Sequence, residues 1–344
     1  MKEYKISKDN RLLLKNTSRT LYLSFVILPD YIKYMLGFAY LIARALDSVV
    51  DCPCVDAATK ERLLRIFLDT GSSKFSNEIS ELKKIVMPEL DNLWERRLID
   101  SIENIVDEFW AGSDDDDKKM IRALIRGLTR GMMMDIKYFP DKEKIRSIKT
   151  SKELIKYSNL IGGVPAIYWY RVYQKYSPNI YKDNVLRSAF RIGTALQLTN
   201  ILKDIHSDLK TGRLYIPDDF LKSVGLLPQD LIDAKNIDKI RPFINSIIIT
   251  CIDYFDEAEL FINSIKSSHL PMKLALIWPI YWAMDSLYLV SVSNPLRSRI
   301  KINREKIYKT LIKSPFLLSS TGFNQGYRFR REMIILSVSS YVNR

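Results

Sequence analysis

The sequence has little glycine and little proline, with 12 and 13 of these residues among 344. Both counts are below the average usage of globular proteins. Since tight turns depend on these two residues, their scarcity disfavours a turn-rich β architecture and long flexible linkers. The composition therefore favours long helices.

Histidine and cysteine are also rare, with two histidines and three cysteines in the chain. Three cysteines cannot build a disulfide framework, which indicates a protein of a reducing compartment. Two histidines exclude a zinc site built on three of them, and no Gly-x-Ser-x-Gly motif is present for a serine hydrolase. The glycine-rich signatures of Rossmann and P-loop nucleotide sites are missing as well.

Long hydrophobic runs are absent from the sequence. The longest run, Leu274 to Met284, lies between Lys273 and Asp285 and contains Pro279. It is too short to cross a bilayer, so we predict a buried core helix here and no transmembrane helix. The lysine-rich residues 1–15 do not have the pattern of a signal peptide.

Negative charge is in the minority, because 40 acidic residues are set against 53 Lys and Arg, which leaves a net charge of +13. Strongly positive proteins attract nucleic acid, anionic membranes or phosphorylated substrates. A lysine-rich proteome would produce the same excess, so charge alone does not identify a partner. The basic-aromatic cluster from Phe323 to Arg331 is predicted to be a solvated or fraying tail helix.

Helical periodicity is present along most of the chain. Residues 31–50 contain no proline, and residues 92–110 place apolar side chains at helical spacing. Ser113 precedes four aspartates and predicts a helix start with solvated acids, because acidic groups are favourable near a helix N-terminus. We predict one all-α domain over residues 1–344, with a core at residues 18–300 and C-terminal helices at residues 301–344.

Two pairs of aspartates are spaced four residues apart, Asp47 with Asp51 and Asp204 with Asp208. On a helix, residues i and i+4 share a face, so each pair presents two carboxylates side by side. Such oxygen ligands suit Mg²⁺, which bridges protein carboxylates to substrate phosphates. Spacing alone is weak evidence, because a chain of this composition contains such pairs by chance.

The residues around the two pairs are more informative. Asp47 and Asp51 interrupt an apolar helix, and Arg44 lies one turn before Asp47. The second segment has a polar stripe and apolar residues on its other sides. The stripe is Gln197, Asn200, Asp204 and Asp208, and the apolar residues are Leu198, Ile201, Leu202 and Ile205. Buried carboxylates are unfavourable unless paired or bound to metal, but surface helices with salt-bridged acids remain an alternative.

The second segment resembles the signature of squalene and phytoene synthases, the head-to-head trans-prenyltransferases. The matching residues are Gln197-Leu-Thr-Asn200-x-x-x-Asp204-x-x-x-Asp208, followed by Lys210-Thr-Gly-Arg213-Leu-Tyr-Ile-Pro217. Four further segments, all earlier in the chain, are similar to the family's motifs and stand in family order. They are Thr17 to Leu21, Arg44-x-x-Asp47-x-x-x-Asp51, Gly131 to Asp135 and Tyr157 to Gly163. The resemblance runs from about Ser18 to at least Pro217.

The resemblance implies an all-α isoprenoid-synthase helical bundle around a central active-site cavity. The implied ligands of Mg²⁺ are Asp47, Asp51, Asn200, Asp204 and Asp208. The implied substrate-binding residues are Ser18, Arg19, Arg44, Gln197, Arg213, Tyr281 and Arg299. Arg44 and Arg213 would act in catalysis at the diphosphate oxygens, and Tyr157 would act near the reacting carbons.

The chain departs from the family pattern close to Tyr157. Ser158 and Asn159 stand where relatives often have a cysteine and an aromatic residue, and Gly162 and Pro165 replace more usual residues. These departures fall on the wall of the expected cavity.

The resemblance, most marked to bacterial squalene-synthase-type members, implies a Mg²⁺-dependent transferase. It would condense two farnesyl diphosphates to presqualene diphosphate and then to squalene with NADPH. A phytoene or dehydrosqualene synthase, which makes no reduction, is the alternative within the family, and a terpene cyclase is a further one. A basic helical module that binds RNA or lipid is the alternative from another class.

We expect prenyl diphosphates as substrates and no nucleic-acid partner. Apolar products and the positive charge predict a cytoplasmic protein that works at the inner face of an anionic membrane without spanning it. The sequence does not determine the prenyl chain length or the oligomeric state.

Overall fold

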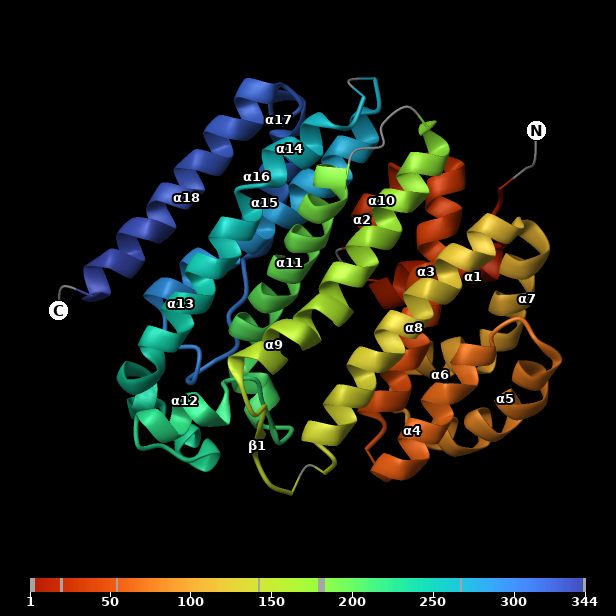
Figure 1. Ribbon diagram of the computed structural model, residues 1–344. Helices are drawn as coiled ribbons and strands as arrows, with labels where there is room; N and C mark the ends of the chain where they lie inside the picture. Colours follow the sequence, from red (N-terminus) through yellow and green to blue (C-terminus); the bar gives the residue numbers. More distant parts are fainter. Residues whose placement is uncertain are drawn as a thin grey trace. The chain divides into compact units, whose positions relative to one another are not determined.

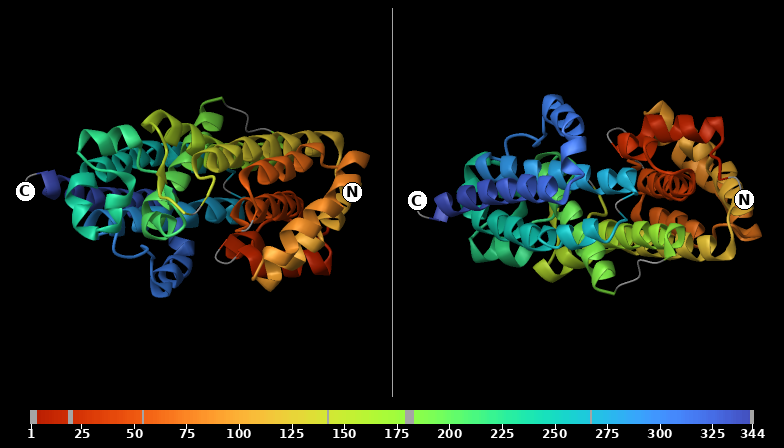
Figure 2. Two further views of the ribbon diagram at one scale, coloured as in Figure 1. Left: turned by 90° about the horizontal axis from the view of Figure 1, so that it is seen from below. Right: turned by 90° about the horizontal axis from the view of Figure 1, so that it is seen from above.

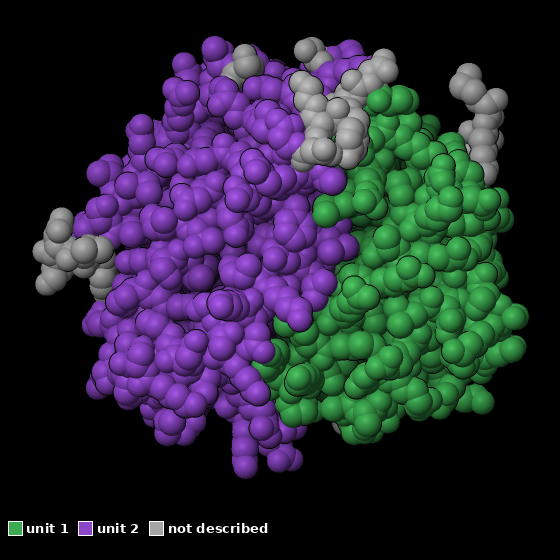
Figure 3. Space-filling model, in the orientation of Figure 1, with its two compact units in different colours: residues 1–140, 167–179 green, residues 141–166, 180–344 purple. Residues whose placement is uncertain are grey.

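The computed structural model describes residues 4–18, 21–53, 55–141, 143–178, 183–266 and 268–342. Almost all of these residues lie in helices, and the two strands have two residues each, so the predicted all-α class is confirmed. The chain divides into two compact units, coloured separately in Figure 3. Unit 1 comprises residues 1–140 and 167–179, and unit 2 comprises residues 141–166 and 180–344. The single domain and the central cavity stay predictions.

The helices of unit 1 precede residue 140, apart from most of α10, and are labelled in Figure 1. They are α1 (Lys8–Ser18), α2 (Leu21–Val26), α3 (Asp30–Asp51), α4 (Ala57–Ile66), α5 (Ser73–Val86), α6 (Leu93–Asp100), α7 (Ile102–Gly112), α8 (Asp115–Tyr138) and α10 (Val164–Tyr176), with the 3-10 turns η1 (Phe67–Asp69) and η2 (Met87–Glu89).

The elements of unit 2 make up the rest of the chain. They are β1 (Arg146–Ser147), α9 (Ser151–Ser158), the π-helical η3 (Asn159–Gly163), α11 (Asp183–Leu209), β2 (Arg213–Leu214), α12 (Asp218–Ser223), the 3-10 turns η5 (Pro228–Ile232) and η6 (Ala234–Asn236), α13 (Ile237–Phe255), α14 (Ala258–Asn263), α15 (Leu270–Val292), α16 (Arg304–Ile312), α17 (Ser314–Leu317) and α18 (Ser320–Val342).

Unit 1 is built around α3, which packs against α1, α4, α6, α7 and α8. The helix begins directly after Pro29, contains no proline and ends two residues before Pro53, as the uninterrupted apolar sequence predicts. Phe38 and Leu46 are fully buried in this packing. Only a narrow polar strip of α3 is left accessible, and it carries the first acidic pair.

Unit 2 is built around α11 in the same way. This helix packs against α9, η3, α13, α14 and α15, and Figure 1 shows it beside α13 and α15. Leu198 and Ala195 are fully buried on the packed sides of α11. The polar stripe of α11 is accessible, and it carries the second acidic pair.

Within the described ranges, one helix has the length and apolar composition of a membrane span, and it is α15. About two thirds of its apolar stretch (67%) is buried inside the protein. It packs against α11, α13 and α18, with Ile277, Met284 and Leu287 fully buried. The predicted buried core helix over residues 274–284 is confirmed.

Residues 92–110 are helical as predicted, and they form two helices because the backbone turns at Ser101 between α6 and α7. One sequence prediction about a helix end is wrong. The cap of α8 is Asp114 instead of Ser113, since the Asp114 carboxylate accepts from the backbone N–H of Asp117 at 2.9 Å. Asp117 is fully buried rather than solvated, and Lys175 lies 2.7 Å from its carboxylate.

The prediction of a solvated tail helix at residues 323–331 is also wrong. This segment belongs to α18, and Phe323 stacks on Tyr281 of α15 with ring centroids 5.6 Å apart. The hydroxyl of Tyr327 donates to Asp256 at 2.7 Å. Phe323 and Tyr327 are both buried, so the aromatic residues of the cluster are part of the core of unit 2.

Two arginines of α18 pair with carboxylates that differ in burial. Arg330 donates to Asp285, which is only 5% exposed and lies 3.2 Å from Lys306 as well. Arg331 donates to Asp256, whose side chain is 37% exposed. The buried carboxylate of Asp285 has two partly buried cationic partners, whereas an exposed pair is weakened by solvent.

We therefore expect Asp285→Asn to lower the free energy of unfolding by about 3 kcal/mol, because two partly buried cations lose their counterion. The matched variant Asp256→Asn is expected to lower it by about 1 kcal/mol or less. Urea unfolding of both variants measures the difference. Equal losses in the two variants would contradict this account of the packing of α18.

Candidate functional site

The first acidic pair lies on the accessible strip of α3 in unit 1. Arg44 Nη1 donates to Asp47, and Arg44 Nη2 lies 2.6 Å from Glu95 Oε1 of α6. The Asp47 side chain is 44% exposed, and Asp51 at the end of the helix is exposed. The first motif is thus a partly exposed group of acids with a guanidinium among them.

The charge of Arg44 is held firmly in this position. Burial acts to lower the pKa of Arg44, but the carboxylates of Asp47 and Glu95 raise it by more, so the net shift is upward. A planar guanidinium with fixed partners can bind phosphate oxygens in a bidentate way. Arg44 is therefore suited to hold the oxygen atoms of a diphosphate.

A polar pocket of about 250 Å³ lies beside Arg44. Its lining residues come from α1, α3 and the start of α6, and they are Asn16, Thr17, Ser18, Tyr40, Arg44, Asn92, Trp94 and Glu95. The Tyr40 hydroxyl donates to the carbonyl of Thr17 at 2.6 Å, which ties the N-terminal motif to α3. The structure thus brings the predicted residues Ser18 and Arg44 to one pocket.

Ser18 itself is nearly buried, and its hydroxyl donates to the carbonyl of Leu14 at 2.5 Å. This bond makes the hydroxyl part of the last turn of α1. Arg19, the other predicted residue of this motif, lies outside the described residues.

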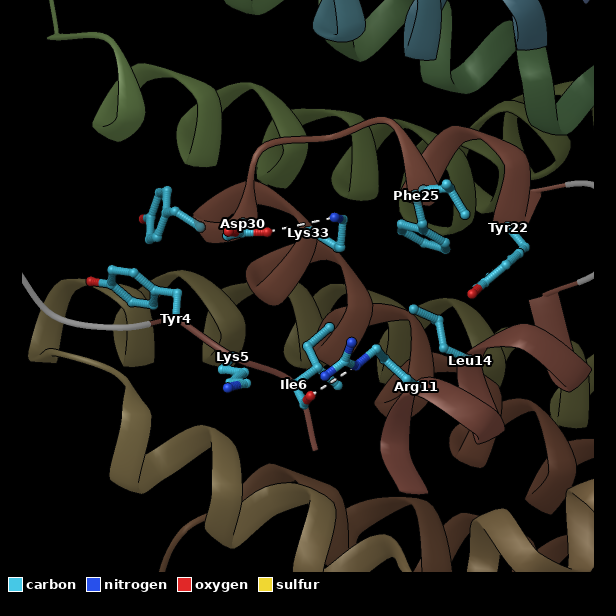
Figure 4. Close-up of a pocket in the computed structure, with 11 residues that line it drawn as sticks. Tyr4, Lys5, Ile6, Arg11, Leu14, Tyr22, Phe25, Asp30 and Lys33 are labelled. Carbon is cyan, nitrogen blue, oxygen red and sulfur yellow. Dashed lines mark hydrogen bonds and ion pairs between the residues drawn. The ribbon is translucent and has the colours of Figure 1, made fainter. Parts of the chain in front are cut away.

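A larger pocket of unit 1, about 680 Å³, lies at the opposite end of α3 and is shown in Figure 4. It is lined by Tyr4, Lys5, Ile6, Arg11, Leu14, Tyr22, Phe25, Val26, Asp30, Tyr31 and Lys33. None of the residues predicted from the sequence is in this lining. Asp30 begins α3 and Asp47 lies near its end, about 25 Å away at 1.5 Å per residue. The larger pocket is therefore not the site of the acidic pair.

The second acidic pair lies on α11 in unit 2, and the predicted polar stripe is confirmed. Its residues Gln197, Asn200, Asp204 and Asp208 are all at least partly accessible. The predicted apolar residues on the other sides, Leu198, Ile201, Leu202 and Ile205, are all buried. The local helical geometry places the four polar side chains along one line.

Asp204 has two cationic neighbours in unit 2. Lys203 Nζ lies 2.8 Å from Asp204 Oδ2, and Arg299 Nε donates to Oδ1. Arg299 follows α15 in a segment that packs on α11, where the N–H of Ile300 donates to the carbonyl of Lys203 at 3.0 Å. The same segment meets His206, whose Nδ1 is 2.8 Å from the carbonyl of Leu296. The predicted residues Asp204 and Arg299 are thus brought together.

Tyr157 lies in the last turn of α9 and is buried. Its ring stacks on Tyr215 with centroids 5.1 Å apart, and the two hydroxyls are 3.2 Å apart. Tyr215 follows β2, which pairs in parallel with β1 through Arg213 and Arg146. The turn before β2 uses Gly212 with φ of 77°, a conformation that favours glycine. This turn sets both Arg213 and Tyr215 in place.

A close backbone contact positions Tyr157 relative to the polar stripe. Directly after α9 the chain forms the π-helical turn η3, and Gly162 in this turn meets Gly193 of α11. A Cβ atom on Gly162 would lie 2.2 Å from the carbonyl oxygen of Gly193, and one on Gly193 would lie 2.3 Å from that of Gly162. Thr194 also donates to Asn159 at 2.9 Å. The unusual residues of this segment therefore serve a close helix crossing.

Tyr281, which the resemblance placed in the substrate-binding set, lies inside unit 2. Its side chain is 1% exposed, and its hydroxyl donates to the carbonyl of Phe323 at 2.6 Å. The guanidinium of Arg330 lies over its ring, 4.2 Å from the centroid. Burial raises the pKa of Tyr281 strongly, so its hydroxyl stays neutral. These contacts assign Tyr281 to the packing of α15 against α18.

Three residues beside the motifs were missed by sequence reasoning: Glu95, Lys203 and Tyr215. Lys203 and Tyr215 lie inside the segments that resemble the family's motifs, so the sequence pointed to their positions. No sequence pattern pointed to Glu95, because it lies in the first turn of α6, where acidic residues are common. Its role follows only from the contact with Arg44.

The donor set fits magnesium as a metal shared with a substrate. Among the described residues, no three His, Cys, Asp or Glu side chains lie close enough to hold a metal by themselves. Asp47, Asp51, Asn200, Asp204 and Asp208 offer the oxygen ligands that Mg²⁺ prefers, and Mg²⁺ takes its remaining ligands from water and phosphate. The residues therefore fit an ion that arrives with a diphosphate.

A family model described as squalene/phytoene synthase matches residues 14–300. The solved structure of TcSQS in complex with a ligand is similar over 98% of this chain and 97% of that chain, with a TM-score of 0.77 and 16% identity. A dehydrosqualene synthase structure is similar over 90% and 95% of the two chains, with a TM-score of 0.60 and 17% identity. These likenesses agree with the helical fold expected from the sequence.

Curated relatives match over shorter stretches. Phytoene synthase 2 of Oryza sativa subsp. japonica is 33% identical over 124 residues, which cover 36% of this chain and 31% of that protein. Phytoene synthase of Daucus carota is 37% identical over 106 residues, which cover 31% and 25%. The matches thus span less than a third of either relative's length.

We expect Gly193→Ala to destabilise the protein by about 2 kcal/mol, because the new Cβ would meet a backbone carbonyl and the Cβ of Ala166 at 2.5 Å. The intrinsic helix preference of alanine acts in the opposite direction. Gly37→Ala in α3 is the control, since its nearest neighbour is the flexible end of Ile6 at 3.0 Å. Urea unfolding measures both variants. A Gly193→Ala protein as stable as the control would contradict the close crossing.

Proposed function

Because the chain belongs to the squalene/phytoene synthase family, whose members are prenyltransferases, we propose that it joins two prenyl diphosphates head to head. One observation carries the proposal: each acidic motif has an arginine in direct contact, Arg44 at Asp47 and Arg299 at Asp204. A metal-bound diphosphate presents charges of both signs, and such a group of acids and arginines is complementary to it.

The metal would be held by the oxygen ligands of the two motifs, Asp47, Asp51, Asn200, Asp204 and Asp208. When bound, Mg²⁺ supplies Lewis acidity at the departing diphosphate. In unit 1, Arg44 would neutralise charge that develops on the leaving oxygen atoms, and Ser18 and Arg19 would border the same diphosphate. In unit 2, Arg213 and Arg299 would neutralise charge in the same way beside the second motif, and the neutral amide of Gln197 would donate a hydrogen bond to the diphosphate.

The carbon chemistry needs an apolar environment with aromatic faces. Loss of the first diphosphate leaves an allylic cation, which the double bond of the second substrate attacks. Loss of a proton then gives a cyclopropylcarbinyl diphosphate. Tyr157 and its stacked partner Tyr215 offer π faces that stabilise a nearby cation. Departure of the second diphosphate and rearrangement lead to the final hydrocarbon.

The last step distinguishes two products. In the squalene reaction two farnesyl diphosphates are used, and a hydride from NADPH quenches the final cation. In a phytoene or dehydrosqualene reaction a proton is lost instead and no reductant is consumed. Our first candidate is squalene, from the resemblance of the sequence. The second is supported by the curated relatives, which are phytoene synthases.

Product analysis distinguishes these candidates. Purified protein is incubated with Mg²⁺ and farnesyl diphosphate, with and without NADPH, and in parallel with geranylgeranyl diphosphate. Squalene formed only with NADPH supports the first candidate and makes NADPH a cofactor. Dehydrosqualene without NADPH, or phytoene from the longer substrate, supports the second. A protein that leaves both substrates unchanged would contradict the proposed reaction.

We place the protein in the cytoplasm, at the inner face of an anionic membrane, because its product would be an apolar hydrocarbon and its net charge is +13. The alternative of an RNA-binding module loses its main support. The aromatic residues of the 323–331 cluster are buried, and Arg330 and Arg331 are paired with Asp285 and Asp256.

Removing a metal-binding carboxylate tests the role of each motif. We expect Asp47→Ala and Asp204→Ala each to lower turnover by about 100-fold or more, because the charge of the leaving diphosphate is no longer balanced. Helical circular dichroism should be unchanged in both. Asp116→Asn on α8, whose side chain is 74% exposed, is the control and should keep full turnover. Near-normal turnover in either alanine variant would remove that motif from the reaction.

Glu95 is proposed as a positioning residue for Arg44. We expect Glu95→Gln to lower kcat/KM by about 10-fold, because the guanidinium loses one of its two charged partners and its fixed orientation. The Mg²⁺ concentration for half-maximal activity should not change, and Glu95→Asp should recover part of the loss. Glu103→Gln, whose carboxylate is 3.9 Å from Lys83, is the matched control. A shifted Mg²⁺ requirement in Glu95→Gln would contradict a role through Arg44.

A further inference from the structure

Three large apolar side chains on the outer face of α16 and α17 are exposed to solvent. Tyr308, Ile312 and Phe316 are 59%, 78% and 58% exposed. They are spaced four residues apart. Tyr308 and Ile312 share a face of α16, and Phe316 follows on α17, so we call the three residues the α16–α17 stripe. Contiguous exposed apolar groups of this kind mark a surface that contacts something.

The opposite face of the same helices is firmly packed within unit 2. Thr310, Ser314 and Leu317 are buried, and Trp278 of α15 donates to the hydroxyl of Ser314 at 2.9 Å. Lys306 lies 3.2 Å from the buried Asp285 of α15. Figure 2 shows α16, in blue, standing out from the other helices of unit 2 in both views. The inner contacts therefore hold the stripe outward.

Cations surround the stripe. Lys301, Arg304, Lys309 and Lys313 are all exposed, and Glu305 is the only acidic residue from position 297 to 331. Glu305 is paired with Lys309 at 2.5 Å. The other three have no ion pair with any residue that the structure describes. The surface therefore combines apolar side chains with uncompensated positive charge.

We propose that the α16–α17 stripe docks on the surface of an anionic lipid bilayer. Tyr308, Ile312 and Phe316 enter the boundary between headgroups and acyl chains, and the surrounding cations meet the lipid phosphates. This proposal rests on the proposed membrane-surface location and not on the proposed reaction.

The charge pattern favours lipid over a second copy of the chain. In a symmetric dimer the same patch lies on both sides of the interface, so the lysines and arginine around the stripe would face each other. Such juxtaposed like charges oppose association. An anionic bilayer compensates them and at the same time accepts the apolar side chains.

A second exposed apolar group on α18 provides a matched control. Phe329 and Leu336 are 64% and 67% exposed, which is similar to the stripe. Phe329 lies between Arg328 and the pair Arg330 and Arg331, which are held by Asp285 and Asp256, and the acidic Glu332 follows. The residues beyond Glu332 to position 340 carry no charge. The control group thus has comparable exposed apolar side chains with less uncompensated positive charge around them.

Vesicle sedimentation with the full chain tests the proposal. Wild-type protein is mixed with vesicles of phosphatidylcholine alone, or of phosphatidylcholine with an equal amount of phosphatidylserine. We expect binding to the anionic vesicles that weakens as salt is added. The triple variant Tyr308→Ser, Ile312→Ser, Phe316→Ser should bind about 10-fold more weakly. The double variant Lys309→Glu, Lys313→Glu should lose binding to a similar extent.

The control variant Phe329→Ser, Leu336→Ser should bind like the wild type. All substituted residues are exposed, so circular dichroism and melting temperature should not change in any variant. Wild-type protein that stays in solution with anionic vesicles would overturn the proposal, as would equal binding by the triple variant. A concentration-dependent dimer that the triple variant abolishes, with vesicle binding unchanged, would assign the stripe to a second copy and overturn it too.

The outcome is independent of the enzyme assay. Turnover of detergent-dispersed prenyl diphosphates should be the same in the triple variant and the wild type. Failure of the vesicle experiment leaves the proposed reaction intact, and absence of product leaves the vesicle result intact.

Discussion

Each unit depends on one constraint: its central helix is largely buried and leaves little accessible surface for charge. On α3 and α11 this surface includes the acidic pairs, and carboxylates in such a partly buried place require nearby cations. Arg44 meets Asp47 and Glu95, while Lys203 and Arg299 meet Asp204. The compensation stabilises the fold and also leaves both signs of charge accessible, as a metal-bound diphosphate requires.

A close backbone contact between η3 and α11 is the second feature that arranges the site. Gly162 and Gly193 allow η3 to approach α11 more closely than any side chain would permit. The approach fixes the end of α9, where Tyr157 stacks on Tyr215. A π-helical turn at this place is a local departure from regular helix, of the kind that often occurs at functional sites. Gly162 and Asn159, two of the residues that depart from the family pattern, take part in the crossing.

The basic residues of the C-terminal helices illustrate how tertiary contacts assign roles. Arg330 and Arg331 of α18 face the carboxylates of Asp285 and Asp256, so they serve the packing of unit 2. Lys309 and Lys313 on the outer side of α16 and α17 have no such carboxylate from another helix among the described residues. The arginines of α18 therefore form ion pairs within unit 2, whereas the lysines of α16 and α17 form a cationic surface.

The sequence by itself determined the helical class, the buried α15 and the polar stripe from Gln197 to Asp208, because these depend on local periodicity and composition. The resemblance to a family identified the motif residues, but it did not identify the distant residues that contact them. Only the tertiary structure decided that Glu95 holds Arg44, which is 51 positions earlier, and that Arg299 lies on Asp204, 95 positions earlier. It also showed that the side chain of Tyr281 is packed in the core of unit 2. Such pairings follow from how helices pack, and no local pattern in the chain encodes which distant residues will meet.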